Sequence, residues 1–268
     1  MNQKREDIRN VAIIAHVDHG KTTLVDELLK QSGVFRDNQE MGVRVMDSNP
    51  IERERGITIL SKNTAVHYKS TKINIVDTPG HADFGGEVER ILKMVNGAIL
   101  LVDAFEGPMP QTRFVLQKAL DLRLPVMVVI NKIDKPQARP AEVEDEVLEL
   151  MMDLNASDEQ LDFPVIYASA VNGYARYEAN DGNMDMVPLL DTILKEIPAP
   201  DVDPEGPIAL QVCTVDHSSY EGRIGVGRLH SGTIREKQQV LVVRPDDEPY
   251  TAQIRKVYTF DKLGKVEV

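Results

Sequence analysis

Residues 8–200 alternate between short, continuous apolar runs and stretches in which apolar residues recur every three or four positions. The continuous runs have strand length and predict buried parallel strands, whereas the periodic stretches predict amphipathic helices that cover them. The expected strands are 10–15, 65–68, 73–77, 98–103, 126–131 and 165–169, and the expected helices are 21–32, 84–96, 111–123, 141–155 and 186–196. This order predicts an α/β fold with a mostly parallel six-stranded sheet.

The pattern changes after residue 197. Residues 197–207 contain four prolines and follow neither a helical nor a strand period, which indicates a semi-rigid linker. Short β-like runs follow at 208–215, 222–231, 239–245 and 250–258, separated by Gly, Asp and Pro. They predict a small antiparallel β-barrel. Because so few residues remain for a closed barrel, we expect one α/β domain at 1–200 and only the start of a barrel domain at 201–268.

The composition, with 42% hydrophobic and 28% charged residues, is that of a soluble globular protein. The apolar runs are far shorter than the roughly 20 residues that a membrane helix needs. Residues 1–7 are polar and of mixed charge, so no signal peptide is visible, and the single Cys213 excludes an internal disulfide. We therefore expect a cytoplasmic monomer without membrane association.

The net charge of −12 limits the possible partners, because an acidic chain gains little from long-range attraction to phosphate polymers. Contacts with RNA would have to be local or lie outside this chain. Residues 142–162 hold nine carboxylates and neither Lys nor Arg. Their apolar positions keep helical spacing, so a solvated helix face followed by a loop is favoured over an acidic docking surface.

A phosphate-binding motif occupies residues 15–22, AHVDHGKT, between the first strand and the first helix. Backbone N–H groups and the helix N-terminus offer partial positive charge to phosphates. Lys21 adds a full charge at the β- and γ-phosphates, and the Thr22 hydroxyl can bind Mg²⁺. Ala15 stands where the usual motif begins with Gly, so the loop must begin there without a left-handed residue. The expected phosphate-binding residues are Asp18, His19, Gly20, Lys21, Thr22 and Thr23.

A second motif, DTPGH at residues 77–81, follows the third expected strand. A strand-end carboxylate at Asp77 would hold Mg²⁺, and the N–H of Gly80 can closely approach a γ-phosphate. Loss of that phosphate would release the loop, which makes it a switch. A lone histidine is more often structural, but the place of His81 beside Gly80 favours a catalytic role in orienting the attacking water, together with Lys21.

The segment ERERGITI, at residues 52–59, lies where a first switch loop belongs. Thr58 would offer its hydroxyl to Mg²⁺ and its N–H to the γ-phosphate. Alone, the string would be interpreted as a charged loop that enters a strand, but its position after a phosphate loop favours the switch. Arg53 or Arg55 would be an arginine finger only as a minority interpretation, since surface pairing with neighbouring Glu52 and Glu54 explains them more simply.

The motif NKID, at residues 131–134, ends the fifth expected strand. The Asp134 carboxylate can accept hydrogen bonds from N1–H and the 2-amino group of guanine, a pair that adenine lacks, so GTP is favoured over ATP. Lys132 would lie along the base plane, and SAVNG at 169–173 can offer a backbone N–H to the guanine carbonyl. The expected base-binding residues are Asn131, Lys132, Ile133, Asp134, Ser169 and Ala170.

The chain resembles the translational GTPases, the relatives of elongation factors Tu and G. The resemblance rests on HVDH within the phosphate loop, RGITI at 55–59, and His81 directly after DTPG. Within that family it is most similar to the TypA/BipA group of ribosome-associated GTPases. VMDSNP at 45–50, GGEVER at 85–90, EGPMPQTRF at 106–114, YEGRIGVGR at 220–228 and SGTI at 231–234 carry this closer likeness.

The resemblance implies a GTP-binding domain followed by the start of a β-barrel, with GTP or GDP and Mg²⁺ bound. It implies GTP hydrolysis on the ribosome, whose RNA helps to position the histidine that matches His81. Val17 and Ile57 match an apolar pair that screens this histidine, and ordinary core residues are the less favoured interpretation of both. Members of the TypA/BipA group are linked to ribosome assembly and to growth under stress or cold.

Several alternatives stay open from the sequence. Another ribosomal GTPase, similar to LepA or elongation factor G, would share the nucleotide motifs. A nucleotide-gated ribosome-binding module with incidental turnover would share them too. A P-loop ATPase or kinase is disfavoured by Asp134. In each ribosomal case, most ribosome contacts are expected from domains beyond residue 268.

Overall fold

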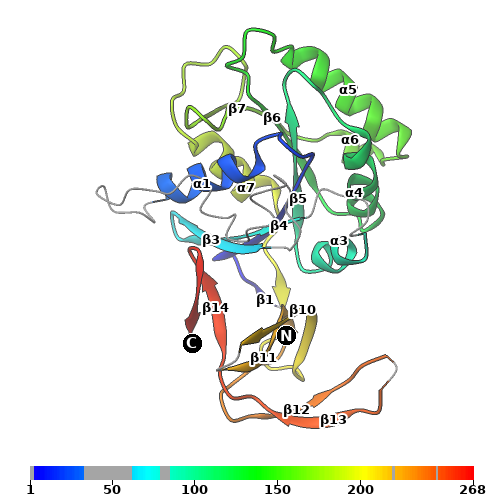
Figure 1. Cartoon of the computed structure of the whole chain (residues 1–268), viewed down its shortest axis with the longest axis vertical. Coiled ribbons are helices and arrows are strands. Elements are labelled where there is room, and N and C mark those ends of the chain that lie inside the picture. The colour runs from blue at the N-terminus through cyan, green and yellow to red at the C-terminus, as the bar shows by residue number, and fades with distance from the viewer. Residues whose placement is uncertain (1–2, 33–61, 79–84, 219–220, 246) are drawn as a thin grey trace.

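A computed structural model describes residues 3–32, 62–78, 85–218, 221–245 and 247–268. Its centre is a seven-stranded sheet in the order β3-β4-β2-β5-β6-β7-β8 (Figure 1). The edge strands β3 and β8 are antiparallel to their neighbours, and the other neighbours run parallel. The strands are β2 (Ile8–Ala15), β3 (Lys62–Tyr68), β4 (Thr71–Asp77), β5 (Gly97–Asp103), β6 (Val126–Asn131), β7 (Val165–Ser169) and β8 (Tyr174–Arg176).

The mostly parallel α/β sheet and its six predicted strands are confirmed, but the predicted strand number was one too low. The additional strand, β8, has three residues, which are too few to form a recognisable alternation of apolar and polar positions. It follows Gly173, whose left-handed φ of 74° turns the chain back antiparallel to β7.

Helices cover both faces of the sheet. On one face lie α1 (Lys21–Gln31) and α7 (Val187–Glu196); on the other lie α3 (Gly85–Leu92), α4 (Pro110–Asp121) and α5 (Pro140–Asp153) (Figure 1). Prolines in the first turns of α4, α5 and α7 help to begin these helices, because the first turn has no partner for the missing N–H. The five predicted helices are present, although the one expected at 84–96 ends at Leu92.

A short helix, α6 (Asp158–Leu161), occupies a segment that we expected to be a loop. Ser157 begins it with a capping box, in which the side chain of Gln160 accepts a hydrogen bond from the Ser157 N–H at 3.0 Å. Four residues are too few to show a helical period, so the cap was the sole available sequence signal.

The apolar core lies in two layers, one on each face of the sheet. Along β2, Val11 and Ile13 pack on the side of α1 and α7, while Ala12 and Ile14 pack on the side of α3 and α4. All four are at most 1% exposed. Burial on both faces explains why the parallel strands are continuous apolar runs instead of alternating patterns.

The remaining residues, 201–268, form what we call the hairpin region. It contains three antiparallel hairpins: β10 (Ala209–Ser218) with β11 (Gly222–Ser231), β12 (Gln239–Val242) with β13 (Tyr250–Gln253), and β14 (Tyr258–Asp261) with β15 (Gly264–Glu267). Each is a separate two-stranded sheet, so the described residues do not close a barrel by hydrogen bonding. The expectation of a single run at 250–258 was wrong, because β13 ends at Gln253 and β14 begins at Tyr258.

The linker expected at 197–207 also contains regular structure. Its residues β9 (Asp201–Val202) pair antiparallel with β1 (Gln3–Lys4) near the N-terminus. Two backbone pairs are too few to produce a sequence pattern, so the expectation of a segment without strand structure was wrong at these positions.

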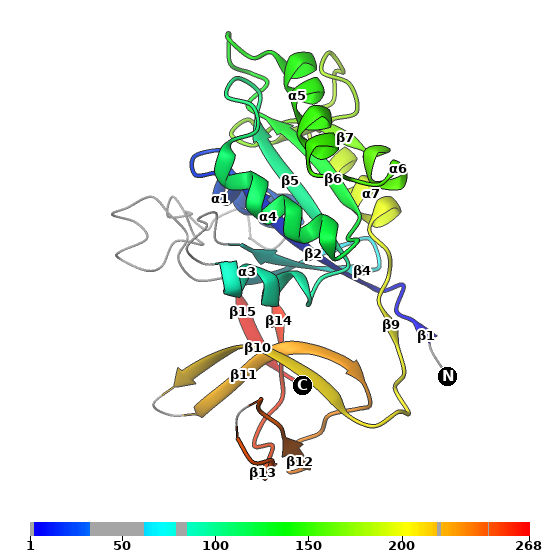
Figure 2. The same ribbon diagram turned by 90° about the vertical axis from the view of Figure 1, so that its right-hand side faces the viewer.

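The hairpin region contacts the α/β part through β14 against β3 (Figure 1) and through β10 against α3 (Figure 2). The Ala65 N–H in β3 donates to the carbonyl oxygen of Lys262 at 3.0 Å. The Arg228 guanidinium of β11 donates to the carbonyl oxygens of Met94 and Val95, each at 3.3 Å, just after α3. These carbonyls lie at a helix C-terminus, where a cation is favourable.

Candidate nucleotide-binding site

The phosphate loop, residues 16–20, joins the carboxyl end of β2 to the beginning of α1. Asp18 and Gly20 adopt left-handed backbone conformations, with φ of 64° and 94°, whereas Ala15 does not. A Cβ at position 20 would lie 2.5 Å from the Asn131 Nδ2 atom. Glycine is therefore needed at position 20 for two reasons, its left-handed backbone conformation and the close approach of Asn131.

Asn131, at the end of β6, holds two loops together. Its side-chain amide donates to the carbonyl oxygen of His19 at 2.9 Å, and its Oδ1 accepts from the Ala170 N–H at 3.0 Å. The residue is 2% exposed. Both ends of this amide thus bind protein groups, and Asn131 fixes the phosphate loop against the loop at 169–173, which we call the base loop.

Lys132 and Asp134 follow Asn131 and face different surroundings. Lys132 has a left-handed φ of 66°, and its ammonium donates to the Asp18 carbonyl oxygen at 2.5 Å. Asp134 is exposed, and its carboxylate has no hydrogen bond or ion pair with any described residue. A carboxylate beside two fixed loops and without a protein partner is suited to accept hydrogen bonds from a ligand.

The base loop is also anchored to α1. The Gln31 side chain donates to the Gly173 carbonyl oxygen at 2.6 Å and accepts from the Met186 N–H at 2.8 Å. Within the loop, the Asn172 amide donates to the Ser169 hydroxyl at 2.9 Å. The backbone N–H of Ala170 binds Asn131, so other N–H groups of this loop would have to meet a base carbonyl.

At the phosphate end of the site, Lys21 projects from the first turn of α1. Its ammonium donates to the Thr78 carbonyl oxygen at 2.6 Å and forms an ion pair with the Asp77 carboxylate. Thr22 is half-buried and Thr23 exposed. The structure thus brings Lys21 and Asp77 together, although Thr58, Gly80, His81, Ile57, Arg53 and Arg55 lie outside the described residues.

The oxygen donors here suit Mg²⁺. A hydroxyl at Thr22 and a carboxylate at Asp77 are hard ligands, and Mg²⁺ is commonly held by one or two protein ligands together with phosphate oxygens and water. Within the described ranges no cluster of three or more His, Cys, Asp and Glu side chains forms a site for a metal ion held by protein alone. The residues present therefore fit a metal that arrives with a phosphorylated ligand.

His19 contributes to the site through its backbone, because its ring is fully buried below the phosphate loop. The ring Nδ1 lies 3.3 Å from the Leu101 carbonyl oxygen, and Nε2 lies 3.4 Å from a carboxylate oxygen of Glu106. The edge of the ring packs near His16, with ring centroids 5.2 Å apart. Burial lowers the pKa of His19, despite the hydrogen bond to Leu101, and so favours the neutral form of the ring.

Asp103, at the end of β5, was not among the predicted site residues. Its buried carboxylate lies 2.7 Å from the Lys132 ammonium. Burial raises the pKa of Asp103, but hydrogen bonds from Lys132 and the Phe105 N–H, with the charges of Lys132 and Lys135, lower it to about 2. The available signal was an ionisable residue at the end of an otherwise wholly apolar strand.

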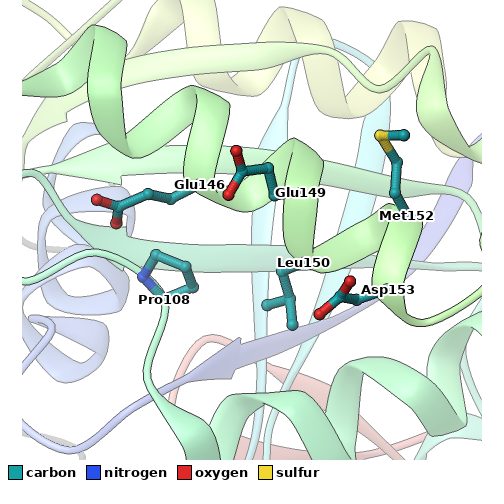
Figure 3. Close-up of a pocket in the computed structure, with 6 residues that line it drawn as sticks. All are labelled: Pro108, Glu146, Glu149, Leu150, Met152 and Asp153. Atoms are coloured by element: carbon teal, nitrogen blue, oxygen red, sulfur yellow. The ribbon is translucent and has the colours of Figure 1, made fainter.

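A separate cavity of about 460 Å³ lies against α5 (Figure 3). It is lined by Pro108, Glu146, Glu149, Leu150, Met152 and Asp153. None of these residues belongs to the nucleotide motifs. Arg139 binds Glu142 and Glu146, and Arg113 pairs with Asp153 at 3.3 Å, so part of the acidic charge of α5 is neutralised within the chain.

Three features define a P-loop nucleotide-binding domain. A glycine-containing loop joins a strand to a helix, a strand-end carboxylate pairs with the lysine that follows this loop, and a second strand-end motif is braced against the loop. Residues 6–199 match the family of elongation factor Tu GTP binding domains, and the chain belongs to this family. It is therefore a guanine-nucleotide-binding protein of the translational GTPase type, with high sequence similarity to the TypA/BipA group.

Curated relatives match over nearly the whole chain. The large ribosomal subunit assembly factor BipA of Bacillus subtilis is 56% identical over 98% of the chain, and that of Synechocystis is 57% identical over 97%. The putative elongation factor TypA-like SVR3 of Arabidopsis thaliana is 51% identical over 98%. The chain spans 43%, 44% and 39% of the length of these relatives.

The fold is shared with solved structures. A bacterial selenocysteine-specific elongation factor, EF-Sec, aligns with a TM-score of 0.69 at 24% identity and covers 97% of this chain and 40% of its own. A Thermus thermophilus protein aligns with a TM-score of 0.70 at 20% identity, over 98% of this chain and 50% of its own. Separately, no helix in the described ranges is both long enough and apolar enough to span a bilayer.

Proposed function

We propose that the protein is a Mg²⁺-dependent GTPase that works as a ribosome-associated molecular switch in assembly of the large ribosomal subunit. The observation that carries this proposal is the Asp134 carboxylate, which is exposed, follows the braced Asn131 and has no partner among the described residues. It can accept both guanine N–H groups. Adenine offers neither N1–H nor a 2-amino group, so its binding would leave the carboxylate unsatisfied.

The chemistry divides among a few groups of this chain. Backbone N–H groups of the phosphate loop and the N-terminus of α1 would bind the phosphates, and the Lys21 ammonium, which is paired with Asp77 here, would bind the β- and γ-phosphates. Thr22, Thr58 and Asp77 would hold Mg²⁺, which would supply charge stabilisation at the phosphates. His81 orients the attacking water, and Gly80 gives its N–H to the γ-phosphate.

The ribosomal role rests on the relatives. Those from Bacillus subtilis, Synechocystis and Salmonella typhimurium are named large ribosomal subunit assembly factors and are 54–57% identical to this chain. We place a GTP-binding domain at 1–200 and the start of a translation-factor-type β-barrel at 201–268. With a net charge of −12, the chain would reach ribosomal RNA through local contacts or through further domains. We place it in the cytoplasm as a monomer.

The nucleotide part of the proposal is tested by titrating the protein with fluorescent mant-GTP, mant-GDP and mant-ATP, with Mg²⁺ and with a chelator. Guanine nucleotides should bind at least about 100-fold more tightly than mant-ATP, a difference of roughly 2.8 kcal/mol. Chelation should weaken GTP binding. Equal affinity for mant-GTP and mant-ATP would overturn the assignment.

The catalytic part is tested with His81→Ala. This variant should keep its GTP affinity and lose stimulated hydrolysis by at least about 100-fold, because a residue that orients water acts in the transition state. Unchanged stimulated turnover would contradict the role of His81. It would favour a nucleotide-gated binding module in which hydrolysis is incidental.

A further inference from the structure

Asp103 ends β5 with a carboxylate whose two oxygens have separate partners. Oδ1 accepts from the backbone N–H groups of Phe105 at 2.8 Å and Glu106 at 3.4 Å, which shapes the turn after the strand. Oδ2 faces two ammonium groups, those of Lys132 at 2.7 Å and Lys135 at 3.4 Å. The Asp103 side chain is fully buried, whereas the side chains of Lys132 and Lys135 are 25% and 42% exposed.

Lys132 connects this carboxylate to the phosphate loop. Its ammonium donates to the carbonyl oxygen of Asp18 at 2.5 Å while it contacts Asp103 Oδ2. Asp18 and Lys132 both have left-handed backbones, with φ of 64° and 66°. A flexible lysine is thus held at both a carboxylate and a carbonyl, between two loops in conformations that L-residues rarely adopt.

We propose that Asp103 is a positioning residue of the guanine site, which acts through Lys132 and fixes both the base-facing lysine and the Asp18 turn. This inference rests on the proposed function, since it assigns Asp103 a part in nucleotide binding. Asp103 lies at the end of β5, where it pairs in register with Asn131 at the end of the neighbouring strand β6. Asp103 orders the Lys132 side chain before the nucleotide binds. The entropy cost of ordering this long side chain therefore does not reduce the affinity for the nucleotide.

Asp103→Asn separates this role from the shaping of the turn. Asparagine keeps one oxygen for the N–H groups of Phe105 and Glu106. It replaces the acceptor that faces Lys132 with an amide nitrogen, which cannot accept a hydrogen bond and carries no charge. The turn should survive, and the lysine should lose its anchor.

The experiment is a double-mutant cycle in which the Kd and the dissociation rate of mant-GDP are measured for Asp103→Asn, Lys132→Ala and the double variant. Asp103→Asn should raise Kd about tenfold, mainly through faster dissociation, as expected for loss of a charged hydrogen bond. In the Lys132→Ala background it should change Kd less than twofold, because its route to the nucleotide is gone. Hydrolysis at saturating GTP should fall less than the affinity does, because saturation restores the bound state that a positioning residue favours.

Lys135→Ala is the matched control. Lys135 faces the same carboxylate oxygen but forms no hydrogen bond with the phosphate loop, so its loss should change Kd less than twofold. Asp103→Glu, which keeps the charge, should regain most of the lost affinity; it keeps the proposal testable if Asp103→Asn folds poorly.

These measurements distinguish failure of the positioning role of Asp103 from failure of the proposed function. The positioning role would be overturned, and the proposed function left intact, by either of two results. One is unchanged mant-GDP affinity in Asp103→Asn. The other is that Asp103→Asn lowers the affinity by the same factor in the wild-type and Lys132→Ala backgrounds. An equal fall in saturated turnover and affinity would point to general damage of the fold and would also overturn it. If the wild-type protein bound mant-GDP no better than mant-ADP, the proposed function and this inference would both fail.

Discussion

Replacing Gly20 with alanine would test whether the phosphate loop and Asn131 form one preorganised unit. The added methyl group would lie 2.5 Å from the Asn131 Nδ2 atom, well inside van der Waals contact. The backbone at this position has a φ of 94°, which side-chain-bearing residues rarely adopt. Either the loop changes its conformation, or Asn131 leaves its two hydrogen-bond partners.

The expected cost follows from these two changes. Left-handed backbone costs an L-residue about 1 kcal/mol, and each of the buried hydrogen bonds of Asn131, at 2.9 and 3.0 Å, contributes about 1 kcal/mol. The sum is about 3 kcal/mol. If the free protein keeps the loop in its native shape, the cost lowers the free energy of unfolding. If the loop relaxes, binding must restore it, and Kd for GDP rises by up to about 100-fold.

Two assays on the same sample distinguish these routes: urea unfolding and mant-GDP titration. We expect the losses in unfolding and binding free energy to add up to about 3 kcal/mol. Gly182→Ala is the control, because its added Cβ meets no atom within 4 Å and its φ is not positive. If Gly20→Ala matched Gly182→Ala in both assays, the account of the phosphate loop as a unit braced by Asn131 would be wrong.

Three further predictions concern the base, the buried ring and the base loop. Asp134→Asn should weaken GTP binding at least about tenfold in a competition titration and favour xanthine nucleotides; unchanged GTP affinity would refute base reading. Burial lowers the pKa of His19 below 6.5, so the unfolded chain binds the proton more readily and the free energy of unfolding falls as pH drops below 6.5. The contribution of His19 to this pH dependence is at most about 1.4 kcal/mol per pH unit. His19→Gln should therefore reduce the difference between unfolding curves measured at pH 7 and pH 5.5. Gln31→Ala should lower the free energy of unfolding by about 1–3 kcal/mol, because it removes the hydrogen bonds to Gly173 and Met186. Lys30→Ala removes only an exposed ion pair and should change the free energy of unfolding by less than about 1 kcal/mol. Equal effects of the last two substitutions would contradict the anchoring role.

The parallel sheet could be predicted from the sequence because its buried strands are long apolar runs. Val126–Asn131 and Val165–Ser169 begin and end as expected, since neighbouring turns and polar residues bound them. By contrast β8 and the β1–β9 pair are too short for any period, and their positions depend on tertiary contacts. The β14–β15 hairpin was missed because it lies at 258–267, beyond the last expected run, and that run at 250–258 also spans the break between β13 and β14.

The site could be predicted in its residue types but not in its partners. The motif order placed Lys21 and Asp77 near one another, because parallel strands end at the same edge of the sheet. It did not predict that Asn131 binds protein at both ends of its amide, or that Asp103 holds Lys132. Such contacts depend on ångström-scale side-chain geometry, and the sequence pattern carries no information at that scale.

We propose that this chain belongs to a GTP-specific switch that the ribosome activates. The most direct test is the rate of phosphate release from GTP and ATP by the protein, with and without 70S ribosomes. We expect slow GTP hydrolysis alone, at least about 100-fold stimulation by ribosomes, and no comparable turnover of ATP. Tight GTP binding without ribosomal stimulation, or equal stimulation with ATP, would contradict the account.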